Sequence, residues 1–275
     1  MKLKIILFGI AWWVFLASPT QAIEEIFYKK DSQIYDSWRI CRTRAQGVDG
    51  FFQATEKGFR PVITFESLGK NTDLAYKYGK EFLAKYPDSY QRAEKIFRFA
   101  RDRVRYTSDL DQFGHREFAL NADELVARID KGDAKGDCED YAILLATMYK
   151  AAGYRSAIVL VPGHAAALVY LPGYRKANAT LKFNGQSGWI WAEATGRSNP
   201  LGWAPSRALQ GKAVAYEIRE VEDLAPESIP ENEVVQVRRK TTPLAISPFF
   251  SILFLMWMLP LFSRIFMVMI IKRKV

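Results

Sequence analysis

Cysteine and histidine are scarce in this chain, whose 275 residues include 2 of each. Two histidines give little support to a zinc site. The cysteines, Cys41 and Cys138, could form a disulfide if an oxidising compartment outside the cell kept them paired. We favour a free Cys138, because the residues around it suit a reactive thiol better than a bridge.

Basic charge is also scarcer than the total suggests. The net charge is +9, but residues 1–22 carry +2 and residues 245–275 carry +4, with no acidic residue in either segment. The part between them is left with +3. We therefore expect no nucleic-acid partner, and the excess of positive charge reflects targeting and anchoring.

Long apolar runs occur at the two ends of the chain. An apolar run after two lysines, closed by small residues near Ala22, predicts a signal peptide over residues 1–22. Residues 245–271 are almost uninterruptedly apolar and long enough to cross a bilayer, which predicts a transmembrane helix. Residues 272–275 form a basic tail, typical of the cytoplasmic side. We expect a single-pass membrane protein whose domain faces the periplasm or the extracellular space.

About 220 residues lie between the ends, enough for one large domain with an extension. Residues 23–88 alternate short apolar clusters with charge and form the expected N-terminal extension, which includes a helix over residues 73–85. Residues 221–244 are acidic and contain prolines, which is typical of a stalk. Residues 89–220 are left as the expected main domain.

The main domain is predicted to begin with helices and end with strands. Apolar residues recur at helical spacing over residues 89–105, with Asp88 as N-cap, and a shorter helix follows at 122–129. A helix from Cys138 to Ala152 is apolar nearly all round, so we expect it at the centre of the fold. Branched and aromatic runs predict strands at 157–161, 164–171, 188–192 and 213–218. This order predicts an α+β fold in which the central helix packs on an antiparallel sheet.

Cys138 lies where this central helix begins. Backbone N–H groups at a helix N-terminus lack partners and, with the helix dipole, favour an anion, so a thiol there ionises more readily and becomes a nucleophile. The alternative is that Cys138 is a small buried apolar residue. Its acidic neighbours, Asp137, Glu139 and Asp140, and the glycine before them argue against that.

A nucleophilic thiol needs a base, and a third group that orients the base. His164 is the better base candidate, because it opens a strand that can meet the first turn of the central helix at one end of the sheet. The other histidine, His115, lies in a charged loop. Glu193 ends an aromatic strand and is the best orienting group, since a carboxylate there is costly to bury without a partner. Asn199 is a weaker substitute.

A family resemblance rests on four segments that occur in order: Gly-Asp-Cys-Glu-Asp-Tyr-Ala at 136–142, Ala-Ala-Gly-Tyr at 151–154, Gly-His-Ala at 163–165 and Trp-Ala-Glu-Ala-Thr at 191–195. Over about residues 89–203 the chain resembles the transglutaminase-like superfamily of papain-fold cysteine enzymes. The resemblance implies a papain-like core, makes residues 89–220 a catalytic domain, and implies a Cys-His-Asp triad, here Cys138, His164 and Glu193.

Two positions depart from the family pattern. The third triad residue is Glu193 where the family usually has Asp, so either the strand register compensates for one more methylene or another group orients the base. Ala165 and Ala166 follow the histidine where Ala-Trp is frequent. The second alanine lacks the bulky side chain that tryptophan would place beside the histidine, which leaves the substrate subclass open.

The Asp-Cys-Glu-Asp run is also similar to bacterial transglutaminase-like cysteine proteinases, in which acids beside the cysteine bind calcium. This resemblance would make Asp137, Glu139 and Asp140 calcium ligands, since clustered carboxylates suit that ion. The alternative is that Asp137 caps the helix and the other two complement its dipole. We favour the alternative and expect no cofactor, because adjacent residues alone rarely supply the six or more ligands that calcium takes.

Together these features predict a membrane-anchored extracytoplasmic cysteine enzyme that acts on peptide or protein amide bonds through a thioacyl intermediate. Water as second substrate would make it a protease or amidase, which we favour because water is always available outside the cell. A lysine amine would make it a protein-crosslinking transglutaminase. A further alternative is a non-catalytic papain-fold module that binds a cell-surface partner. The presence of both Cys138 and His164 argues against this alternative.

Overall fold

The computed structural model describes residues 27–55, 58–69, 74–206, 208, 210–219, 233–234 and 236–239. The chain divides into two compact units, Met1–Val237 and Arg238–Val275, and the architecture below is that of the first. No helix within the described ranges is long and apolar enough to cross a membrane. The predicted signal peptide, transmembrane segment and basic tail lie outside the described residues, as does most of the predicted stalk.

The helices are α1 (Val62–Gly69), α2 (Leu74–Lys85), α3 (Ser89–Arg103), α4 (Asp109–Phe113), α5 (Ala122–Lys131) and α6 (Cys138–Ala151). The first strands are β1 (Tyr28–Lys30), β2 (Gln33–Tyr35), β3 (Cys41–Gln46), β4 (Gly50–Thr55), β5 (Gly58–Pro61), β6 (Arg105–Tyr106) and β7 (Lys135–Gly136). The later strands are β8 (Ser156–Val161), β9 (His164–Tyr170), β10 (Ala179–Phe183), β11 (Gln186–Ala192), β12 (Val214–Ile218), β13 (Glu233–Val234) and β14 (Gln236–Arg239).

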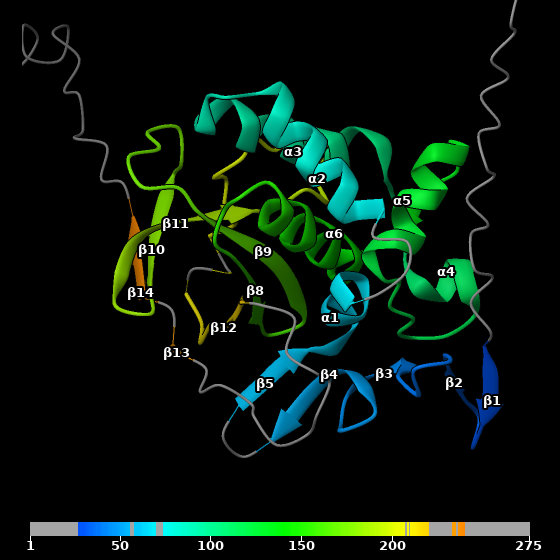
Figure 1. Cartoon of the computed structure of the whole chain (residues 1–275). Helices are drawn as coiled ribbons and strands as arrows, with labels where there is room; N and C mark the ends of the chain where they lie inside the picture. Colours follow the sequence, from blue (N-terminus) through cyan, green and yellow to red (C-terminus); the bar gives the residue numbers. More distant parts are fainter. Residues whose placement is uncertain are drawn as a thin grey trace, which may run out of the picture. The chain divides into compact units, whose positions relative to one another are not determined.

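Within the first unit, the larger sheet has the strand order β13-β12-β8-β9-β11-β10. Its central pairs, β12 with β8, β8 with β9, and β9 with β11, are antiparallel. Helix α6 packs on β8 and β9, and α2 and α3 pack on α6 in turn (Figure 1). The α+β prediction, with the helix that begins at Cys138 lying on an antiparallel sheet, is therefore confirmed.

Both faces of this sheet are buried, which explains the apolar runs along its strands. In β9, Ala165, Ala167 and Val169 belong to the core that contains α6. Ala166 and Leu168 point to the opposite face, because successive side chains of a strand alternate, and there they join a second cluster. Helix α6 is enclosed by the sheet on one side and by helices on the other, as its apolar surface predicts.

The helices predicted before Cys138 are also present. The segment predicted at 73–85 is α2, and the segment predicted at 122–129 is α5. Helix α3 starts after Asp88, whose carboxylate accepts a hydrogen bond from the Gln91 N–H at 2.7 Å. Such a side-chain cap satisfies a backbone donor that the helix itself leaves unpaired.

The N-terminal extension folds into a second sheet, which the sequence did not predict. Its order is β1-β2-β3-β4-β5, with β3 and β4 parallel. The fully buried Arg42 on β3 pairs with Asp36 at 2.8 Å, Glu66 at 3.0 Å and Glu124 at 3.1 Å. Because Glu124 belongs to α5, these ion pairs join the extension to the domain that contains Cys138. Removing one partner of such a buried network leaves an uncompensated charge, which is strongly destabilising.

Candidate active site

Cys138 is the first residue of α6, and the residue before it, Asp137, is the N-cap. Gly136 is required here, because a Cβ at this position would lie 2.8 Å from Oδ2 of Asp140. That carboxylate accepts hydrogen bonds from the N–H groups of Leu120 at 2.7 Å and of Asp137 at 3.2 Å. The buried Asp140 thus fixes the backbone of the segment that carries the Cys138 thiol.

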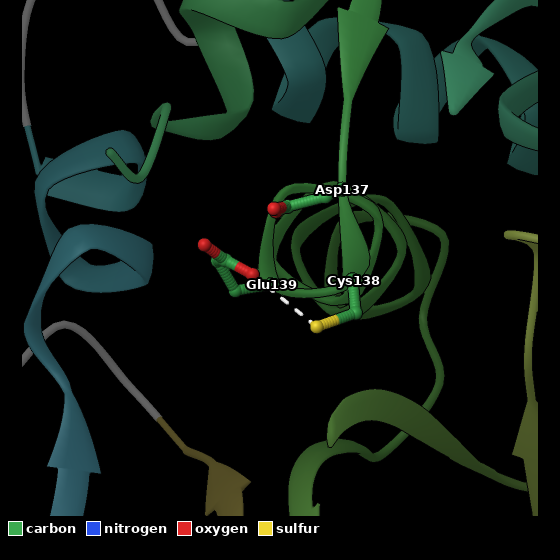
Figure 2. A group of neighbouring side chains, drawn as sticks. All are labelled: Asp137, Cys138 and Glu139. Carbon is green, nitrogen blue, oxygen red and sulfur yellow. Dashed lines mark hydrogen bonds between the residues drawn. The ribbon is translucent and has the colours of Figure 1, made fainter. Parts of the chain in front are cut away.

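The thiol lies next to a carboxylate of its own helix turn. Cys138 is half-buried, and its Sγ is hydrogen-bonded to Oε2 of Glu139 at 3.3 Å. Figure 2 shows this contact and shows the side chains of Asp137 and Glu139 leaving the helix start on the same side. The start of α6 therefore presents a nucleophile and two acidic groups together.

His164 is positioned by a tight turn at the start of β9. Val161 of β8 pairs with His164, so Pro162 and Gly163 form a two-residue turn, and Gly163 has φ +69°. Glycine suits that position because it has no Cβ to clash in the left-handed region. The imidazole is 23% exposed, which leaves it open to a reaction partner from solvent.

Glu193 directly follows β11 and contacts the histidine. Its Oε2 is hydrogen-bonded to Nε2 of His164, and its Oε1 accepts a hydrogen bond from the Thr195 hydroxyl. Nδ1 of His164 is therefore the ring nitrogen left for the thiol. Since Ala192 pairs with Ala167, Glu193 is offset along the strands from His164, and such diagonal neighbours suit a long side chain. This offset gives a physical reason for the longer side chain of glutamate at position 193.

The charges of this pair shift both pKa values. Burial would lower the pKa of His164, but hydrogen bonds with Cys138 and Glu193, together with their charges, raise it to about 10. Burial would raise the pKa of Glu193, but the hydrogen bond and charge of His164 and the hydroxyl of Thr195 hold that pKa below its ordinary value. At neutral pH His164 is thus an imidazolium paired with a carboxylate and facing Cys138.

The acidic residues beside Cys138 have the chemistry of a cation site. Burial is the largest cause that raises the pKa of Glu139, followed by the charge of Asp140. Oδ1 of Asp137 and Oε1 of Glu139 are buried and have no hydrogen-bond partner among the residues that the structure describes. These two residues fit a divalent cation. Asp140 differs, because both of its oxygens already accept backbone N–H groups.

Other candidates lie away from this arrangement. No contact described in the structure joins His115 or Asn199 to Cys138 or His164, and Asn199 instead forms a turn with Gly196 and accepts a hydrogen bond from Arg101. Both cysteines are free, and Cys41 lies in the N-terminal sheet. The disulfide between Cys41 and Cys138 is therefore not formed.

Two residues near the site were not singled out by the sequence. Thr195 holds Glu193 through its hydroxyl, and only its position two residues after the carboxylate could have suggested this role. Tyr106 is 54% exposed and lies on β6, opposite Gly136 of β7. Burial, then the charges of Cys138 and Asp137, raises the pKa of its phenol, as expected for a group close to the thiol.

Comparison with known protein families finds a match that spans the residues described above. Residues 76–206 match the family model described as the transglutaminase-like superfamily. The match begins within α2 and covers Cys138, His164 and Glu193. No curated protein matches the chain.

Proposed function

Because residues 76–206 form a domain of the transglutaminase-like superfamily, which indicates a cysteine-based enzyme with a peptide or protein substrate, we propose that Cys138, His164 and Glu193 are its catalytic triad. The observation that carries the proposal is the His164–Glu193 pair facing a thiol at the start of α6. The proposed reaction is cleavage of a peptide or protein amide bond through a thioacyl intermediate.

In the proposed mechanism the proton of the thiol resides on His164, so that Cys138 attacks as a thiolate. A C–S bond forms at the carbonyl carbon, and the Cys138 backbone N–H stabilises the oxyanion. The C–N bond then breaks while the imidazolium gives its proton to the leaving amine. His164, now neutral, takes a proton from the second substrate, whose attack breaks the C–S bond and restores the thiolate. A calcium ion held by Asp137 and Glu139 would offset the negative charge beside the thiol.

Hydrolysis is the proposed outcome, with water as the second substrate. Hydrolysis and transfer to an amine can be distinguished by mass spectrometry. The products to be analysed are those formed from a glutamine-containing peptide library, with and without a millimolar primary amine. We expect two kinds of main product: peptides cleaved at a backbone amide, and peptides in which a glutamine side chain has been hydrolysed to a carboxylate. We expect little incorporation of the amine. Products that carry the amine in most turnovers would instead establish the protein-crosslinking alternative.

The proposed location of the domain is outside the cytoplasm, with residues 245–271 as anchor and residues 272–275 inside. The proposal is supported by the apolar ends and the basic tail of the sequence. We expect the full-length chain in the membrane fraction, and we expect protease added to intact cells or spheroplasts to remove the domain. Protection of the domain while a tag after Val275 is cut would show the opposite orientation.

A further inference from the structure

A short turn after Glu193 carries an exposed arginine. The N–H of Asn199 donates a hydrogen bond to the carbonyl of Gly196 at 3.1 Å, which closes a four-residue turn with Arg197 at its tip. The turn follows Glu193 by a few residues, so it begins close to the carboxylate that contacts His164. Loops placed in this way beside a rigid core are where binding residues concentrate.

The turn is tied to the end of α3, which lies beside the start of α6. Nη1 of Arg101 on α3 donates a hydrogen bond to the carbonyl of Asn199 at 2.9 Å. At the C-cap of the same helix, the carbonyl of Val104 accepts a hydrogen bond from the phenol of Tyr141 at 2.5 Å. Tyr141 belongs to the first turn of α6, which begins at Cys138. The end of α3 thus connects the turn to the helix start that carries the thiol.

The charge of Arg197 acts on the same first turn of α6. The pKa of the Tyr141 phenol is raised, mainly by burial and then by the charge of Asp140. The charge of Arg197 opposes this rise, whereas the charge of Glu193 adds to it. Because salt screens charges that are far apart, Arg197 and Glu193 both lie close to the phenol. The hydrogen bonds and the charges together place Arg197 beside the proposed triad.

The guanidinium of Arg197 is open to a ligand. Arg197 is exposed to solvent. Among the residues that the structure describes, none forms a hydrogen bond or an ion pair with this guanidinium. A guanidinium presents a planar fork of N–H donors that matches the two oxygens of a carboxylate. A cation on an anchored turn beside a reactive thiol is therefore available to an anion that arrives with the substrate.

We propose that Arg197 binds a carboxylate of the substrate, so that the enzyme prefers peptides with a carboxylate one or two residues from the amide bond that Cys138 attacks. This inference rests on the proposed function in taking Cys138 as the reacting group. The carboxylate can belong to an acidic side chain or to the C-terminus of a peptide, since both present the same two oxygens. At about 3.5 Å per extended residue, this spacing places the carboxylate beside the thiol and not at it.

The acidic surroundings of the thiol make such a cation decisive for an anionic substrate. Asp137, Glu139 and Glu193 lie close to Cys138 or to its histidine, and they repel a carboxylate that has no cation of its own. An ion pair in full contact with water is worth at most about fivefold in affinity, whereas a hydrogen-bonded pair that the substrate covers is worth roughly tenfold or more. Loss of Arg197 is therefore expected to slow acidic substrates far more than neutral ones.

Alkylation of Cys138 measures this preference without cleavage of an amide. One set of reagents consists of iodoacetyl-glutamate, iodoacetyl-glutamine and iodoacetyl-lysine, each with an amidated C-terminus. A second set is iodoacetyl-glycine with a free or an amidated C-terminus. Each reagent forms a C–S bond with the thiol and loses iodide, and peptide mapping of the full-length protein separates reaction at Cys138 from reaction at Cys41. Dividing each rate by that of N-acetylcysteine amide removes intrinsic differences between the reagents.

We expect the glutamate reagent to label Cys138 of the parent protein roughly tenfold faster than the glutamine reagent does. Arg197→Gln should abolish this preference, mainly by slowing the glutamate reagent, and Arg197→Glu should favour the lysine reagent. Arg197→Lys keeps the charge but loses the planar fork, so it should keep part of the preference. Lys182→Gln is the matched control, because Lys182 is an exposed basic residue on β10, and this variant should behave as the parent does.

The inference is overturned if the glutamate and glutamine reagents label the parent protein at equal rates, if Arg197→Gln keeps the preference, or if Lys182→Gln loses it. The two glycine reagents identify the source of the carboxylate. A faster reaction of the free C-terminus indicates that Arg197 binds a chain end, and a preference confined to the glutamate reagent indicates an acidic side chain. Failure of the proposed function is a separate result: no thioester forms on Cys138, although the preference in alkylation persists.

Discussion

Replacing Cys138 by alanine is expected to lower the rate of amide cleavage by about 10⁴-fold or more, because no thioacyl intermediate can form without the sulfur. His164→Ala should cost nearly as much. The double variant should be little slower than either single one, since members of a triad act as a unit. The measurement is kcat/KM for a peptide substrate cleaved by the parent protein.

Cys41→Ala is the control for the loss of a thiol. Cys41 is fully buried in the N-terminal sheet and is free, so its replacement should leave kcat/KM within a few-fold of the parent value. If Cys138→Ala keeps more than about one per cent of the parent activity, attack by this thiol is not the chemical step.

Glu193→Gln is expected to lower kcat/KM by about 10²–10⁴-fold while the fold persists. A neutral amide cannot stabilise the imidazolium and can select the wrong tautomer of His164, the effect known for the corresponding change in serine protease triads. Glu193→Asp keeps the charge but is one methylene shorter, so its activity should lie between those of Glu193→Gln and the parent. Glu81→Gln, an exposed change on α2, should have no effect.

Glu193→Gln is also expected to change the pH dependence of the activity. The pKa of His164 is raised to about 10, so its proton is held below that pH and lost above it. Activity that needs the imidazolium should fall as the pH rises through about 10 in the parent. Because Glu193 helps to raise this pKa, Glu193→Gln should move the alkaline limb to lower pH. If Glu193→Gln leaves both the alkaline limb of the pH profile and kcat/KM unchanged, Glu193 is not a member of the triad.

The free energy of unfolding should also depend on pH, because the pKa of His164 differs between the folded and unfolded states. A histidine whose pKa is raised on folding stabilises the folded state fully below its ordinary pKa of about 6.5, and this contribution disappears as the pH rises through the folded value. For His164 the window runs from about 6.5 to about 10. Glu193→Gln should therefore reduce the difference in Tm between neutral and alkaline pH.

The positions of Cys138, His164 and Glu193 could be predicted because local signals mark each of them. Gly136 and Asp137 precede the apolar helix that begins at Cys138, and a Pro-Gly turn precedes His164. Glu193 follows an aromatic strand that pairs with the strand of His164. Local patterns fix these elements, and antiparallel neighbours then bring their ends together.

The N-terminal sheet could not be predicted in the same way. Its strands are short and mix charged with apolar residues, as in the Cys-Arg-Thr-Arg-Ala-Gln run of β3. Arg42 reads as a surface residue in the sequence, and only its partners on other elements explain why it is fully buried. Such pairings depend on tertiary contacts that no local pattern encodes.

Asp109 and Glu117 were missed as acidic neighbours of the thiol for a related reason. The segment that carries them reads as a charged loop around His115. It is brought to the start of α6 by β6 and β7, strands of two residues each, whose pairing leaves no periodic signal in the sequence. A short parallel contact of this kind appears only once the fold is known.

Mass spectrometry of the acid-quenched enzyme tests the central claim most directly. The full-length protein is mixed with peptide amide and ester substrates, quenched within the first turnovers, and digested for peptide mapping. We predict an acyl group in thioester linkage on the peptide that contains Cys138, reduced in yield by Glu193→Gln and absent from Cys138→Ala. An acyl group found elsewhere, or none with any substrate between pH 5 and about 10, would contradict the enzyme and favour a non-catalytic binding module.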